Sequence, residues 1–341
     1  MRKPIFYFLG VIMIAALFVS FPIFAEKEEK ALEKEEVTVG FLTPMFGSLS
    51  WLGIQTAFDE RAKELGANTV ILNADFDVQR QLSQVEQLIA RNVDGIVIGP
   101  IDAEAIVAGI EKANKAGIPV VTCARSAVGG EVIYDARQDE KSAVTLAVIY
   151  LALQGKEFKI LDLMGDLADI NGLERHEFLK QEVAWWPHLE IVAEIPTKWD
   201  LKLAKDGVIN AFQAHPEINA MFVASDYLLP PTLAALEAIG RLKVKGDPNH
   251  ITIVTLDGDP VGMENIRKGY IDADVVEAYR EMAVAAAEAI YWAATGHEVT
   301  KAEIRKWNEL TRAFLATREN IDHLGDKIWG IAFKGQTFEK E

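Results

Sequence analysis

Residues 94–123 of the chain read DGIVIGPIDAEAIVAGIEKANKAGIPVVTC. Two short apolar runs, at 95–98 and 120–123, flank a stretch at 104–115 in which apolar residues return at the three- and four-residue spacing of a helix. Gly117 stands where a helix C-cap is expected. Because both runs are apolar throughout, they indicate strands of a parallel sheet that is covered on both faces. The stretch therefore predicts a strand–helix–strand unit.

The same alternation continues on both sides of this unit. In the first half we expect further strands at 37–42, 70–72 and 132–134, with helices at 52–65 and 79–90. In the second half strands are expected at 159–163, 191–195, 220–223, 251–255 and 273–276. Amphipathic stretches lie between them, at 140–153, 173–183, 201–214, 232–239, 261–268 and 281–295. Two such series predict an α/β fold of two doubly wound parallel-sheet lobes.

The composition excludes several classes of protein. With 341 residues the chain is long enough for two domains, and 35 basic against 51 acidic residues give a formal charge of -16. That balance argues against binding to nucleic acid or to an anionic membrane surface. The single cysteine, Cys123, rules out an internal disulfide framework, and the six histidines show no metal-binding spacing. We expect no metal and no cofactor.

The N-terminus has the layout of a secretory signal peptide. Arg2 and Lys3 precede an uncharged, mostly apolar run at 5–25, which ends in the small residue Ala25. We expect residues 1–25 to be removed and the protein to be periplasmic or secreted. The alternative is an uncleaved membrane anchor, because the apolar run is long enough to span a bilayer. In residues 26–36 nine of eleven are Glu or Lys, which predicts a solvated tether.

Polar and aromatic residues gather just after the predicted strands, where ligands bind in sheets of this architecture. The list lacks a nucleophile beside a base and a glycine-rich phosphate loop. Carboxylates and guanidinium groups suit the hydroxyls of a neutral polyhydroxylated ligand, and tryptophan faces pack on the C–H faces of a sugar ring. We select as candidate ligand-binding residues Ser48, Ser50, Trp51, Arg125, Asn171, Arg175, Trp199, Ser225, Asp257 and Glu277.

Six segments, in order, resemble the type 1 periplasmic binding proteins of the ribose- and galactose-binding class, which feed ABC sugar transporters. The resemblance extends from residue 37 to about 324 and rests on the order and spacing of the segments together. They are DGIVIGP at 94–100 with Asp102, AGIPVVT at 116–122, AHPEINAMF at 214–222, TLDG at 255–258, GYI at 269–271 and RENID at 318–322.

The resemblance implies a domain plan with three chain crossings. It implies an N-terminal lobe of 37–138 plus 278–311, a C-terminal lobe of 139–277 plus 312–330, and a tail at 331–341. The crossings fall near Gln138, Glu277 and Thr311.

The resemblance also assigns roles within the site. The ring-stacking aromatics fall on Trp51 and Trp199, one arginine of each lobe on Arg125 and Arg175, and the hinge-side aspartate on Asp257. The sequence departs from the family at three of its site positions, where Glu277 replaces an amide, Ser225 an asparagine and Ala124 a common aspartate. The loss of that aspartate, with Pro44 where polar residues are common, favours a deoxy sugar, a polyol, a furanose or a non-sugar of similar size.

The leading hypothesis is therefore a monomeric solute-binding protein, without enzymatic activity, that delivers a small sugar or sugar-like ligand to the permease of an ABC importer. One alternative keeps the fold and presents the ligand to a chemoreceptor or a sensor kinase. Another is a secreted glycosidase with Asp257 and Glu277 as paired carboxylates. The signal peptide argues against the effector domain of a transcription factor.

Overall fold

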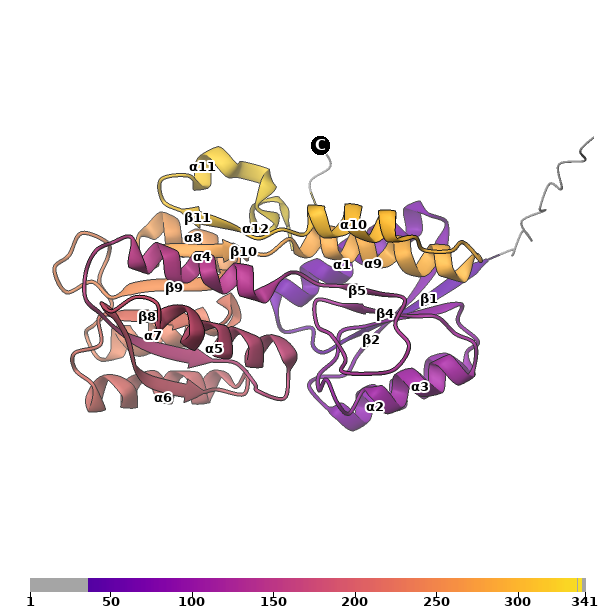
Figure 1. Cartoon of the computed structure of the whole chain (residues 1–341), viewed down its shortest axis with the longest axis horizontal. Helices are drawn as coiled ribbons and strands as arrows, with labels where there is room; N and C mark the ends of the chain where they lie inside the picture. The colour runs from indigo at the N-terminus through magenta and orange to yellow at the C-terminus, as the bar shows by residue number, and fades with distance from the viewer. Residues whose placement is uncertain (1–35, 336, 339–341) are drawn as a thin grey trace, which may run out of the picture. The chain divides into compact units, whose positions relative to one another are not determined.

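A computed structural model describes residues 36–335 and 337–338. The predicted signal peptide and all but the last residue of the predicted tether lie outside these residues. The described chain forms two α/β lobes, each built around its own mainly parallel sheet (Figure 1), which confirms the predicted fold class.

The first lobe holds a five-stranded parallel sheet in the order β2-β1-β3-β4-β5. Its strands are β1 (Val37–Thr43), β2 (Ala67–Asn73), β3 (Gly95–Ile98), β4 (Val120–Cys123) and β5 (Tyr134–Ala136). The predicted runs 95–98 and 120–123 are therefore strands with the expected bounds. The last strand is shifted by two residues from the predicted 132–134, although the Ile133 N–H already bonds the Val120 carbonyl.

Helices cover both faces of the first sheet. The helices α2 (Val78–Ala90) and α3 (Val107–Lys115) pack together over one face, where Leu88 and Ile110 are fully buried. The helices α1 (Leu49–Glu64) and α9 (Tyr279–Ala294) pack together and α9 contacts β3, β4 and β5. Helix α10 (Lys301–Leu310) packs on α9. The first lobe is thus completed by a segment that lies far along the chain.

The second lobe holds a six-stranded sheet in the order β11-β10-β9-β8-β6-β7. Its parallel strands are β6 (Phe158–Met164), β7 (Leu189–Pro196), β8 (Ala220–Val223), β9 (Thr252–Asp257) and β10 (Ala273–Val276). The edge strand β11 (Phe314–Thr317) runs antiparallel to β10 and was not predicted from the sequence. The helices of this lobe are α4 (Glu140–Ala152), α5 (Ile170–Val183), α6 (Leu201–Ala214), α7 (Leu229–Ala238) and α8 (Pro260–Lys268).

The chain passes between the two sheets three times: from β5 to α4, from β10 to α9, and from α10 to β11. After β11 come the short helices α11 (Ile321–Leu324), η2 (Gly325–Lys327) and α12 (Trp329–Ala332), while η1 (Asp226–Leu228) lies between β8 and α7. After α12, Phe333 and Phe338 are buried against each other. No helix within residues 36–335 is long and apolar enough to cross a membrane.

Candidate functional site

A cavity lies where the carboxyl ends of strands from both sheets meet. It is small, with a volume of about 40 Å³. Nine of the ten predicted site residues line it, and Glu277 is the exception. The lining also includes Ala124, the site position that departs from the family, and five residues that the sequence did not single out: Met45, Ile54, Phe76, Tyr227 and Tyr279. The site is therefore more apolar than its predicted residues suggest.

The first-lobe wall is built by the start of helix α1. This helix begins at Leu49, three residues earlier than predicted, and the Ser48 hydroxyl caps it by accepting from the backbone N–H of Trp51. The early start places Ser50 and Trp51 in the first helical turn. The Trp51 indole lies against Gly99, where a Cβ atom would come within 2.5 Å of the ring. Gly99 at the end of β3 therefore provides the space that the Trp51 ring occupies.

Arg125 lies between the two predicted stacking tryptophans. Its guanidinium carbon is 5.4 Å from the centre of the Trp51 ring and 6.0 Å from that of Trp199. Arg125 Nη2 also forms an ion pair with Oδ2 of Asp169, which belongs to the second lobe, at 2.9 Å. The Trp199 indole N–H donates to the same carboxylate at 2.8 Å. Arg125 thus both lines the cavity and joins the lobes.

Asp169 was not among the predicted site residues. It is 1% exposed, and burial raises the pKa of its carboxyl even though Arg125 opposes that shift. Its position in the sequence gave a usable signal, because Asp169 lies directly before helix α5, in the loop that follows strand β6, and Asp is a preferred N-cap residue. As an N-cap that also pairs with a cation, it fixes the start of the helix that carries Asn171 and Arg175.

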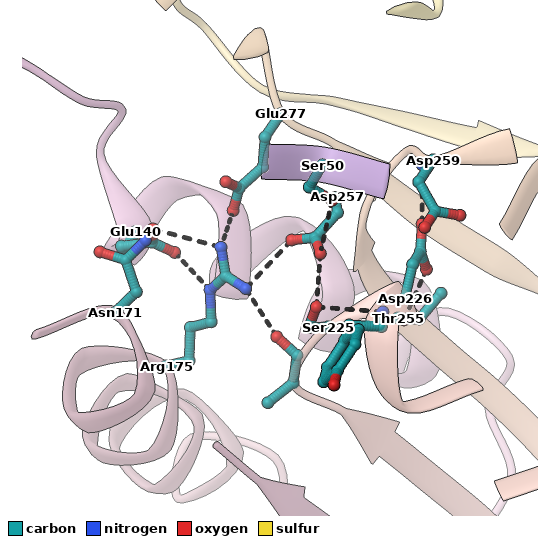
Figure 2. A network of polar contacts seen from close by, with 12 residues as sticks. Ser50, Glu140, Asn171, Arg175, Ser225, Asp226, Thr255, Asp257, Asp259 and Glu277 are labelled. Carbon is teal, nitrogen blue, oxygen red and sulfur yellow. Dashed lines mark hydrogen bonds and ion pairs between the residues drawn. The ribbon is translucent and has the colours of Figure 1, made fainter. Parts of the chain in front are cut away.

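Arg175 occupies the centre of a buried polar network (Figure 2). Its five N–H groups all have protein acceptors: Glu140 accepts twice, at 2.9 and 3.3 Å, and Glu277, Asp257 and the Ala224 carbonyl accept once each. Glu140, at the first residue of α4, was not predicted. Arg175 therefore bonds carboxyl groups from the start of α4, from the end of β9 and from the residue just after β10.

Asp257 ends strand β9 and is the most constrained residue of the site. Its φ of 118° is a strained value for a residue other than glycine, with a cost of order 1–3 kcal/mol. Its carboxylate accepts from Ser225, from the Tyr279 hydroxyl at 2.8 Å, from Arg175 at 3.2 Å and from Ser50 at 3.4 Å. Ser50 belongs to the first lobe, so this contact also crosses between lobes. Donors from four segments therefore fix the carboxylate.

Glu277 lies behind Arg175 and not on the cavity wall. It is fully buried, and one carboxyl oxygen accepts from Arg175 while Oε2 has no hydrogen-bond partner among the described residues. Burial raises the pKa of the Glu277 carboxyl well above its usual value, although Arg175 opposes the shift. Because the raised pKa favours the neutral carboxyl, which carries an O–H donor where the family amide carries N–H donors, the replacement of that amide by Glu277 is a smaller chemical change than an ordinary glutamate would make.

Asn171 supplies an acceptor that the protein leaves open. Its Nδ2 group donates to the backbone carbonyl of Ala124, in the first lobe, at 2.8 Å. Its Oδ1 atom is buried at the cavity and has no partner among the residues that the structure describes. An unpaired buried acceptor costs free energy that a ligand hydroxyl in the cavity recovers. Ala124 itself, with φ of 61°, leaves room where a larger side chain would enter the cavity.

A cluster of buried carboxyls lies beneath the turn that follows Asp257. Asp226 accepts from the Thr255 hydroxyl and from the Asp259 N–H, and Asp274 accepts from the Gly258 N–H. Burial, with repulsion from neighbouring carboxylates, raises the pKa of Asp274 to about 8 and that of Asp226 well above its usual value. The Ser225 hydroxyl caps the short helix at 226–228, and Asp226 supports the turn after Asp257.

Two facing α/β lobes with a cavity at their strand ends define the class of two-lobed solute-binding proteins. The model of a periplasmic binding protein domain matches residues 39–298, and the chain belongs to that family. A ribose import binding protein of Bacillus subtilis is 28% identical over 256 residues, which are 74% of this chain and 79% of that protein. A D-apiose import binding protein of Paraburkholderia graminis is 25% identical over 254 residues, 74% of this chain and 78% of that one.

Solved structures show the same fold. A solute-binding protein of Bacillus halodurans with bound myo-inositol superposes with a TM-score of 0.75 at 23% identity, covering 84% of this chain and 96% of that one. A galactofuranose binding protein gives a TM-score of 0.77 at 20% identity, covering 87% of this chain and all of the other. These relatives are binding proteins.

Proposed function

We propose that the protein captures a small neutral sugar, polyol or similar molecule between its lobes and delivers it to the permease of an ABC importer. The observation that carries this proposal is the cavity between the lobes, in which two tryptophans flank an arginine and the buried acceptor of Asn171 has no protein donor. The import proteins among the relatives favour transport over presentation to a sensor.

The walls of the cavity favour a ligand that has fewer hydroxyls in need of a protein acceptor than a common aldopyranose has. Ala124 offers no side-chain acceptor, donors already surround the carboxylate of Asp257, and protein acceptors already bond the N–H groups of Arg175. Met45, Ile54 and Phe76 add apolar surface. Deoxy sugars meet this condition better than a fully hydroxylated ring, while furanoses and polyols present their hydroxyls in a different geometry from an aldopyranose.

A thermal-shift panel of sugars, deoxy sugars and polyols tests the proposal. A ligand present at 100 times its Kd should stabilise the protein by about 2.7 kcal/mol, which raises Tm by several degrees. Myo-inositol, ribose and apiose belong in the panel. The proposal fails for this ligand class if no compound shifts Tm. Release of product from a glycoside panel would instead support a carbohydrate-active enzyme.

We also infer that the mature protein works outside the cytoplasm as a monomer, after cleavage behind Ala25. The layout of residues 1–25 supports the cleavage, and the import role of the relatives supports the location. N-terminal sequencing of the exported protein should begin at Glu26, and light scattering should give the mass of one chain. Retention of the full chain in the membrane fraction would favour the anchor.

A further inference from the structure

The segment after β11 contacts the most constrained residue of the site. Trp329, at the start of α12, is 2% exposed, and its indole N–H donates to the backbone carbonyl of Asp257 at 2.8 Å. The backbone of the next residue, Gly330, packs closely against the turn after Asp257. A Cβ atom at Gly330 would come within 2.3 Å of the Gly258 carbonyl oxygen. Thus α12 holds the turn from outside the cavity.

The same indole also contacts the first lobe. A Cβ atom on Gly53, in helix α1, would lie 2.9 Å from Cζ3 of Trp329, so the ring edge lies directly against the helix backbone. The Tyr279 ring is 5.7 Å from the Trp329 ring, and its hydroxyl donates to the Asp257 carboxylate. Trp329 therefore contacts a helix of the first lobe, the crossing into α9 and the strained backbone of Asp257.

We propose that Trp329 is a positioning residue of the ligand site. It holds Asp257 in its left-handed conformation through the carbonyl and, through Gly53, favours that conformation when the lobes are closed. A positive φ at a residue with a side chain persists only where surrounding contacts determine it. The indole N–H supplies such a contact at the carbonyl, and opening of the lobes would carry Gly53 away from the ring.

A ligand-free measurement tests the first part of this proposal. In Trp329→Phe a six-membered aromatic ring is kept, and the indole N–H is lost together with the five-membered ring. Amide hydrogen exchange at Gly258 and Asp259, whose N–H groups bond Asp274 and Asp226, should become about tenfold faster, the equivalent of one lost hydrogen bond. Exchange in strand β1 should stay unchanged. The matched control is Trp185→Phe, because Trp185 is 80% exposed at the end of α5. Wild-type exchange at both amides in Trp329→Phe would overturn the proposal.

The second part rests on the proposed function and uses the compound with the largest thermal shift. We expect Trp329→Phe to weaken its binding by about five- to tenfold. Gly53→Ala, which adds a methyl group against the indole, should weaken binding similarly although it leaves the indole N–H in place. In an Asp257→Asn background the effect of Trp329→Phe should shrink, since both act on one residue.

The outcomes separate the two proposals. If no panel compound binds, the proposed function fails and the exchange measurement still decides the role of Trp329. If a compound binds and the effects of Trp329→Phe and Asp257→Asn add fully, Trp329 acts only on general stability and the positioning role is wrong. Unchanged affinity in Gly53→Ala would overturn the link to closure.

Discussion

All N–H groups of Arg175 donate to protein acceptors, so its main role is to hold the site together. Removing its guanidinium would leave the buried carboxylates of Glu140 and Asp257 unpaired, which is strongly destabilising. A ligand gains contact with Arg175 only by replacing one of its protein acceptors. At the scale of single residues, we therefore expect the two tryptophan rings and Asn171 to meet a ligand most directly.

Replacing Trp199 by Ala should weaken ligand binding by about 5- to 150-fold, from the loss of roughly 1–3 kcal/mol of apolar contact. Calorimetric titration measures this. Trp199→Phe separates the ring from the N–H that bonds Asp169, and should recover much of the affinity. Unchanged affinity in Trp199→Ala would show that the ring is only part of the core.

Glu277→Gln should keep the fold and ligand affinity. The folded-state pKa of Glu277 is raised, so its protonated form stabilises the folded protein. This stabilisation is complete below the unfolded-state pKa of about 4.3 and is lost as pH rises through the folded-state pKa. The variant stays neutral throughout. Its urea midpoint relative to wild type should therefore increase from pH 5 to pH 9.

Glu140→Gln is the matched control for this substitution, because Glu140 makes two bonds to the same guanidinium. It should destabilise the protein at neutral pH by weakening that ion pair. An equal loss of stability in Glu277→Gln would show that Glu277 is charged and needed as an anion.

At the scale of elements, the sequence predicted the central strands best. Strands β3, β4, β8 and β10 have the predicted bounds, because they are short apolar runs buried on both faces. The ends of the sheets were harder: β11 is a four-residue antiparallel edge strand with partly exposed residues, and its pairing with β10 depends on tertiary contacts. Helix α10 was missed although Thr300 and Glu303 form a capping box that announced it.

The site followed the same division. Residues directly behind strands were found from position alone, since parallel strands deliver their carboxyl ends to one edge. Glu140 and Tyr279 come from the crossings between lobes, and their roles depend on how the lobes face each other. Trp329 lies past the last segment that resembles the family, and local sequence gives no sign that it reaches Asp257.

The carboxyl cluster beneath the β9–α8 turn should make stability fall as pH rises. The pKa of Asp274 is raised from its usual value near 4 to about 8. Between these two pH values the folded state keeps a proton that the unfolded chain has already released, so stability is lost as pH rises. Asp274→Asn removes this titration while keeping the side-chain shape. Its unfolding free energy should fall less than that of wild type between pH 6 and pH 9.

Denaturant unfolding at the two pH values measures the difference. Asp322→Asn is a suitable control, because Asp322 is an exposed carboxylate on α11. If the wild type and Asp274→Asn lose equal stability over this range, the cluster does not hold a proton in the folded protein.

At the scale of the whole described molecule, direct contacts hold the two lobes together around the cavity. Arg125 pairs with Asp169, Asn171 donates to the Ala124 carbonyl, and Ser50 reaches Asp257. A ligand shifts the balance toward closure only to the extent that it binds the closed form better than the open one. The cavity walls come from both lobes, which provides that difference.

Arg125→Ala should favour the open form, because it leaves Asp169 buried without its cation in the closed one. We expect at least about a tenfold loss of ligand affinity and a larger radius of gyration without ligand. Adding Asp169→Asn should restore part of the closure, since the lone charge is removed. If Arg125→Ala closes and binds as wild type does, the ion pair does not stabilise the closed form.

Small-angle scattering of the wild-type protein, with and without the compound selected by the thermal-shift panel, tests the central claim most directly. Hinge motion through three crossings changes the separation of the lobes, and ligand that contacts both lobes draws them together. We predict that the radius of gyration decreases on addition of saturating ligand, with no product formed. An unchanged radius of gyration, while calorimetry shows that the same compound is bound, would contradict capture of the ligand by closure of the two lobes.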